Sequence, residues 1–102
     1  MKDFNYVVKE IFRITNKIER KTMQELALKT SEECGELAQA VLSVTAAPGC
    51  KYKNKTFEDV DEEAVDTIIC AFATAFKHSK NPGRLMKVFE KKMTKWKEKL
   101  AS

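Results

Sequence analysis

The chain has 102 residues, a length that fits one domain, and its formal net charge is +4. No run approaches the roughly 20 apolar residues of a membrane span, and the N-terminus lacks the apolar core of a secretory signal. The three cysteines, Cys34, Cys50 and Cys70, show no paired spacing, so we expect a cytoplasmic protein with reduced thiols. With only 3 Gly and 2 Pro, the chain has few places to turn, which favours a few long helices.

The first half of the sequence predicts two helices. Apolar residues recur every three or four positions over residues 3–19, which is the helical period. A second helix is predicted over residues 22–44. It begins with a capping-box pattern, in which Thr22 is the N-cap and Glu25 is the third helical residue.

A long loop at residues 45–55 separates these helices from the rest of the chain. Pro48 and Gly49 break the helical pattern, and the loop then carries Lys51, Lys53 and Lys55. Loops of this length in small domains are often functional or mobile.

Two further helices follow the loop. Thr56 predicts the start of a helix that runs to about His78. Its residues 67–76 are apolar nearly all round, so we expect neighbours or a partner subunit to bury it. Asn81 and Pro82 predict the start of the last helix. Its apolar stripe is Leu85, Val88, Phe89, Met93, Trp96 and Leu100. No strand pattern competes, so the sequence predicts one all-α domain over residues 1–102.

Two acidic clusters, at residues 31–37 and 61–66, interrupt apolar helical patterns. Glu33 shares one helical arc with apolar residues, and Glu36 and Glu32 lie toward its edge. In the second cluster, Glu63 and Asp66 share a side with small residues, whereas Glu62 projects toward solvent. Burial of ionised carboxylates costs several kcal/mol each unless positive charge lies among them.

A divalent metal ion would resolve this cost. If the two helices pack side by side, Glu33, Glu36, Glu63 and Asp66 can converge on Mg²⁺, or on Mn²⁺, in an all-oxygen site. Gly35, which is unfavourable inside a helix, suggests close approach of another group. The alternative is that these are ordinary acidic helix faces, because the helix dipole favours acids such as Asp59, Asp61 and Glu62 in a first turn.

The two acidic clusters also resemble the sequence motifs of a known family. Residues 32–37 (EECGEL), followed after the loop by residues 63–66 (EAVD), resemble the EExxE…ExxD motifs of the MazG-like all-α nucleoside triphosphate pyrophosphatases. The resemblance implies a four-helix bundle that is completed by oligomerisation, as a homodimer or homotetramer. It implies Mg²⁺-dependent hydrolysis of a nucleoside triphosphate to the monophosphate and pyrophosphate, in nucleotide-pool house-cleaning.

The resemblance further implies roles for individual residues. Glu33, Glu36, Glu63 and Asp66 would be metal ligands, and Glu32 would help to orient or deprotonate the attacking water. Lysines would bind the phosphates, the candidates being Lys53, Lys55 and Lys92. Many relatives carry Lys-x-x-x-Asn on the last helix. Lys92 matches the lysine, whereas Trp96 stands in place of the asparagine.

Two other functions remain open from the sequence. Residues 84–99 are strongly basic, which is compatible with a non-enzymatic helical module that binds nucleic acid. Within the enzyme class, the phosphoribosyl-ATP pyrophosphatase branch of the same superfamily is the second alternative.

Overall fold

Four helices form the fold in the computed structural model, which describes residues 3–49 and 54–102; within these ranges there is no strand. The all-α prediction is therefore confirmed for the described part of the chain. The helices are α1 (Phe4–Lys17), α2 (Met23–Val44), α3 (Phe57–Phe76) and α4 (Pro82–Ala101). None of them is both long and apolar enough to cross a membrane.

The helix starts follow the predicted capping residues. At α2, the Thr22 side chain accepts a hydrogen bond from the Glu25 N–H at 3.1 Å, and the Glu25 carboxylate accepts one from the Thr22 N–H at 2.8 Å. Thr56 and Asp59 make the same reciprocal pair at α3. These bonds satisfy N–H groups that have no partner within a helix, so they fix where each helix begins.

The predicted ends of two helices are slightly too long. α1 ends at Lys17, because the backbone leaves the helical region at Ile18. α3 ends at Phe76, and His78 already belongs to a turn. The Lys77 ammonium donates to the Glu19 carbonyl oxygen at 2.8 Å, which ties the end of α3 to the segment between α1 and α2.

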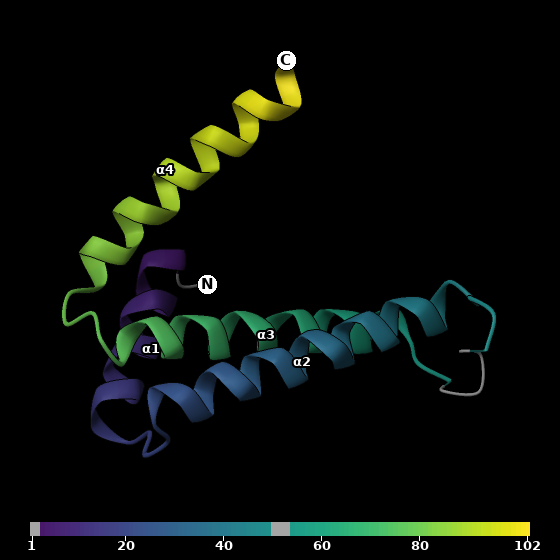
Figure 1. The fold of residues 1–102 in the computed structure, drawn as a ribbon, viewed down its shortest axis with the longest axis horizontal. Helices are drawn as coiled ribbons and strands as arrows, with labels where there is room; N and C mark the ends of the chain where they lie inside the picture. Colours follow the sequence, from purple (N-terminus) through teal and green to yellow (C-terminus); the bar gives the residue numbers. More distant parts are fainter. Residues whose placement is uncertain (1–2, 50–53) are drawn as a thin grey trace.

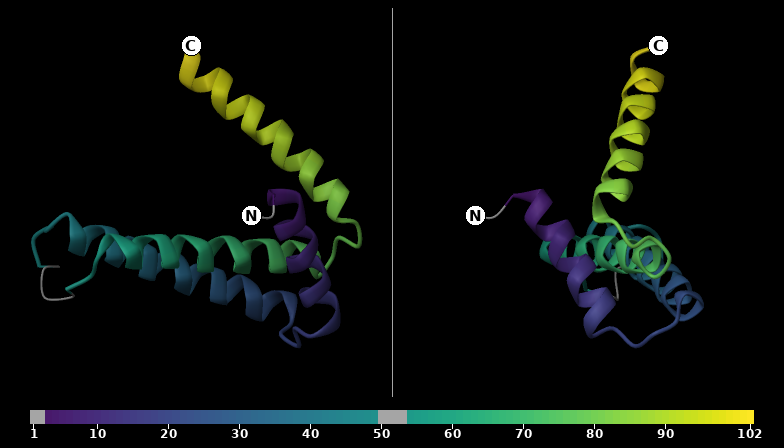
Figure 2. Two further views of the ribbon diagram at one scale, coloured as in Figure 1. Left: turned by 180° about the vertical axis from the view of Figure 1, so that it is seen from behind. Right: turned by 90° about the vertical axis from the view of Figure 1, so that its left-hand side faces the viewer.

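α2 and α3 lie side by side as a long antiparallel pair, and α1 crosses one end of it (Figure 1). α4 leaves from that same end and projects away from the pair, as Figure 2 shows from two further sides. The buried core lies at this junction. It consists of Val8, Ile11 and Phe76, with Phe12, Phe72, Leu85 and Met86 packed against it.

A closed four-helix bundle is not formed by these helices alone. α4 has no buried residue, and its interhelical contacts are mainly with α1. On α3 only Ala73 and Phe76 are buried, so the expected burial of its apolar faces is not achieved within one chain. Trp96, part of the apolar stripe predicted for the last helix, is 60% exposed and is not part of the core of this chain.

Candidate metal centre

The packing of α2 against α3 determines which acidic side chains meet. Leu26, Glu33 and Ala40 recur every seven residues on α2, and all three are buried, so Glu33 lies on the face that packs against α3. The Thr30 and Thr74 hydroxyl oxygens lie 3.4 Å apart across this interface. Small side chains there let the two helices approach closely. The arc predicted for α2 is therefore confirmed.

Three carboxylates converge where these helices pack. Oxygens of Glu33, Glu36 and Glu63 all lie within 4.8 Å of one another, with Glu33 buried and Glu63 half-buried. The Oε2 atoms of Glu33 and Glu63 are buried and have no hydrogen-bond partner among the described residues. Buried polar atoms are normally satisfied, so two such oxygens in one acidic cluster are compatible with a bound cation. An all-oxygen donor set of this kind fits Mg²⁺ or Mn²⁺.

The surroundings of Glu63 disfavour its ionised form. Burial raises its pKa above the ordinary value, and a hydrogen bond with the Glu36 side chain and the nearby charges of Glu36, Glu33 and Asp66 raise it further. Burial likewise raises the pKa of the Cys70 thiol, and the charge of Glu33 adds to this effect. Both shifts have the sign expected of a desolvated, negatively charged pocket.

One basic residue, Lys29, lies beside the cluster. The Lys29 Nζ is 3.2 Å from Oε1 of Glu33 and 3.3 Å from Oε1 of Glu32. These two carboxylates raise the pKa of Lys29, chiefly through the hydrogen bond to Glu33. The signal was present in the sequence, because Lys29 stands four residues before Glu33, the spacing at which helical side chains meet.

The remaining predicted acids lie at the edge of the cluster. Asp66 is exposed and is not among the three converging residues. With Asp61, Glu62 and Val65 it lines a surface hollow on α3. Glu62 is exposed, as expected. The Glu32 side chain is 59% exposed and shares Lys29 with Glu33, so it lies next to the cluster but outside it.

The predicted phosphate-binding lysines are not brought to the carboxylates within the described chain. Lys53 lies outside the described residues. Lys55 is exposed just before α3, and its backbone N–H donates to the Ser43 hydroxyl at 3.0 Å. Lys92 lies on the projecting α4, where it lines an apolar groove with Met93 and Trp96.

Gly35 is not explained by packing within one chain. A Cβ atom added there would meet no heavy atom within 4 Å, so the close approach predicted from this glycine is absent here. Its exposed backbone lies on α2 between Glu33 and Glu36, beside the converging carboxylates.

Comparison with known proteins identifies neither a family nor a similar structure for this chain. No family model, no curated protein and no solved structure matches this chain.

Proposed function

We propose that this protein is a Mg²⁺-dependent nucleoside triphosphate pyrophosphohydrolase, which converts a (d)NTP to the monophosphate and pyrophosphate in cytoplasmic nucleotide-pool house-cleaning. The observation that carries the proposal is the pair of buried, unpartnered carboxylate oxygens on Glu33 and Glu63. They come from two helices whose acidic motifs resemble those of MazG-like enzymes. A site that leaves two buried acceptors unsatisfied is costly to fold, so its retention favours a functional role.

The proposed roles follow the geometry of the acids. Glu33, Glu36 and Glu63 would hold the ion, and Asp66, three residues beyond Glu63 on the exposed side, would be the fourth ligand. When bound, Mg²⁺ neutralises phosphate charge and lowers the pKa of a coordinated water, and Mn²⁺ can do the same. Glu32 accepts the proton of the attacking water, because it is adjacent to the cluster and accessible to solvent.

A pyrophosphate-release assay tests this function. Purified protein is incubated with Mg²⁺ and a panel of ribo- and deoxyribonucleoside triphosphates. We expect release by the wild-type chain and none above background by the Glu36→Gln, Asp66→Asn double variant. Glu62→Gln, which neutralises an exposed acid of the same helix, is the matched control and keeps its activity. Wild-type protein no more active than the double variant on every nucleotide would refute the proposal.

The substrate class has one alternative within the same chemistry, phosphoribosyl-ATP. This molecule carries the unaltered triphosphate of ATP, so the same carboxylates would serve it. Adding it to the assay panel decides the question, because the preferred substrate is the one with the higher kcat/KM.

A second class of function draws on α4. This helix is exposed over most of its length and carries seven basic residues against two acidic ones, a composition that suits a phosphate backbone. Binding to DNA or RNA would weaken steeply as salt rises. No binding at low salt would exclude this alternative. We rank it second because the chain shows no recognisable nucleic-acid motif.

We also propose that the enzyme works as a homodimer or homotetramer. The exposed apolar side chains of α3 and α4 support this, since a monomer of this size gains little by leaving them in water.

A further inference from the structure

Lys29 on α2 is a basic residue in direct contact with the candidate metal centre. Its Nζ lies 3.2 Å from Oε1 of Glu33 and 3.3 Å from Oε1 of Glu32. Within the described part of the chain, no other lysine or arginine forms an ion pair with one of the three converging carboxylates. The roles proposed above use the carboxylates around this ammonium but give the ammonium itself none.

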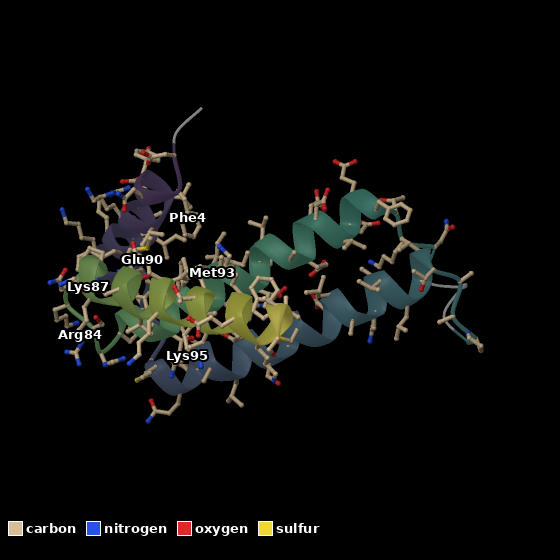
Figure 3. All side chains as sticks on the ribbon, turned by 90° about the horizontal axis from the view of Figure 1, so that it is seen from above. Phe4, Arg84, Lys87, Glu90, Met93 and Lys95 are labelled. Carbon is tan, nitrogen blue, oxygen red and sulfur yellow. The ribbon has the colours of Figure 1, made fainter. Side chains whose placement is uncertain are left out.

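The basic residues of α4 do not take the place of Lys29 within one chain. Figure 3 looks down on α4 and labels Arg84, Lys87 and Lys95, whereas Figure 1 shows this helix rising away from the α2–α3 pair. None of these three residues forms an ion pair with an acid of α2 or α3 in the described ranges. An anion that binds at the carboxylates of one chain therefore has Lys29 as its nearby ammonium.

The two oxygens of Glu33 have different surroundings. Oε1 is paired with Lys29, whereas Oε2 has no hydrogen-bond partner among the described residues, although Glu33 is only 6% exposed. Both oxygens are bonded to one carbon, so a divalent cation at Oε2 and an ammonium at Oε1 would be close neighbours of like charge. Occupation of the centre by a cation therefore weakens the attraction of Glu33 for Lys29.

The Lys29 side chain can exchange these carboxylates for a phosphate. It is 40% exposed, whereas the Glu33 side chain is 8% exposed, so a solvent-borne anion can reach it. A lysine has a flexible stem and three donors, which suit a phosphate oxygen as well as a carboxylate. Three carboxylates also outweigh the two charges of one divalent cation, and Lys29 supplies the third positive charge next to an anionic substrate.

The contact with Glu32 indicates which phosphate Lys29 reaches. Glu32 is the proposed acceptor for the proton of the attacking water, and Lys29 lies beside it. In phosphoryl transfer the attacking and the leaving oxygens lie roughly in line, on opposite sides of the phosphorus atom. A group next to the base therefore lies near the phosphoryl group under attack and away from the departing pyrophosphate.

We propose that Lys29 leaves Glu32 and Glu33 when substrate binds, and donates to a non-bridging oxygen of the α-phosphoryl group of the nucleoside triphosphate. The ammonium stabilises the charge on this group, and its departure leaves Glu32 able to accept a proton. The water oxygen bonds to the α-phosphorus, and its proton passes to Glu32. The bond from this phosphorus to the bridging oxygen breaks, and pyrophosphate leaves with the electron pair. This inference rests on the proposed function.

Separate binding of the two products tests the position of Lys29. Calorimetric titration in excess Mg²⁺ compares a panel of ribo- and deoxyribonucleoside monophosphates with inorganic pyrophosphate. We expect Lys29→Met to bind the monophosphate that wild type prefers about tenfold more weakly, as for the loss of one charge-assisted hydrogen bond. Its affinity for pyrophosphate should stay within about twofold of wild type, which also shows that the variant is folded.

Two further variants serve as controls for this titration. Lys29→Arg keeps the positive charge and should recover most of the monophosphate affinity. Lys21→Met removes an exposed lysine that pairs with Glu19, and should change neither affinity. Unchanged monophosphate binding by Lys29→Met overturns the proposal. An equal loss for both products, a loss confined to pyrophosphate, or a wild-type chain that binds no monophosphate overturns it as well.

Kinetics distinguish this inference from the proposed function. With the preferred nucleotide, Lys29→Met should lower kcat/KM by about tenfold or more, because the contact persists in the transition state. Failure of the proposed function would appear as a wild-type chain that releases no pyrophosphate from any nucleotide. Failure of this inference alone would appear as an active wild-type chain whose Lys29→Met variant keeps its kcat/KM and its monophosphate affinity.

Discussion

At the scale of single residues, Lys29 and Glu33 set the electrostatics of the candidate metal centre. The Lys29 ammonium binds one oxygen of Glu33, whose other oxygen is buried without a partner. One oxygen of this buried carboxylate therefore has a positively charged partner among the described residues, and the other oxygen does not. A lysine in this position stabilises the metal-free protein and repels a divalent cation that enters beside it.

Replacement of Lys29 separates these two effects. We expect Lys29→Met to lower the melting temperature of the metal-free protein and to tighten Mn²⁺ binding by about tenfold, or ~1.4 kcal/mol. Calorimetric titration with Mn²⁺ measures the affinity. Lys21→Met, which removes an exposed partner of Glu19, should change neither quantity. Weaker Mn²⁺ binding by Lys29→Met would show that Lys29 mainly orients the ligands.

Whereas Lys29 is expected to stabilise the metal-free protein, Glu63 is expected to destabilise it. Its folded-state pKa is raised above the ordinary value of 4.5, so its ionised form destabilises the folded protein at neutral pH. We therefore expect Glu63→Gln to melt at a higher temperature than wild type at pH 7 without metal. The difference should shrink as the pH falls through the raised pKa.

The same variant reports on the metal. Added Mg²⁺ should raise the melting temperature of the wild type but not that of Glu63→Gln, because a ligand is lost. Glu62→Gln should behave like wild type in both series, since Glu62 is exposed. A Glu63→Gln variant that is less stable than wild type without metal would contradict the electrostatic reading.

At the scale of helices, local sequence determines the starts and the packing faces. The threonines that cap α2 and α3, and the arc of α2 that holds Glu33, were predicted from spacing alone. They depend on hydrogen bonds and side-chain directions within one or two turns, which is the range over which a sequence pattern is informative. The end of α1 was less predictable, because no Gly or Pro marks it.

The threonines that cap α2 and α3 should contribute measurably to the free energy of unfolding. Thr22→Ala and Thr56→Ala are each expected to lower the free energy of unfolding by about 1 kcal/mol, and Thr94→Ala, within α4, by less. Hydrogen bonds from backbone N–H groups lower the pKa values of Glu25 and Asp59. The ionised carboxylates therefore stabilise the folded protein at neutral pH. This stabilisation should be lost as the pH falls through those lowered values. Equal losses for all three variants would argue against capping.

At the scale of the whole molecule, the core is small and lies at one end. Phe76 is fully buried among residues of α1 and α3, whereas Phe57 is 72% exposed. We expect Phe76→Ala to cost about 3–5 kcal/mol of unfolding free energy and Phe57→Ala less than about 1 kcal/mol. Urea unfolding measures both. Similar losses would mean that the Phe57 side chain is covered in solution.

The sequence by itself determined the helices, their caps and the inward-facing position of Glu33, because each depends on side-chain spacing along one helix. Tertiary structure alone decided that Glu33, Glu36 and Glu63 meet while Asp66 stays outside, since this depends on how α2 and α3 are placed against each other and not on spacing along either helix. It also decided that α4 stands away from α3. The apolar stripe of α4 predicts a contact surface, but only the structure shows that Leu85 packs against the core while Met93 and Trp96 stay exposed, because a stripe gives the face of a helix and not its direction in space.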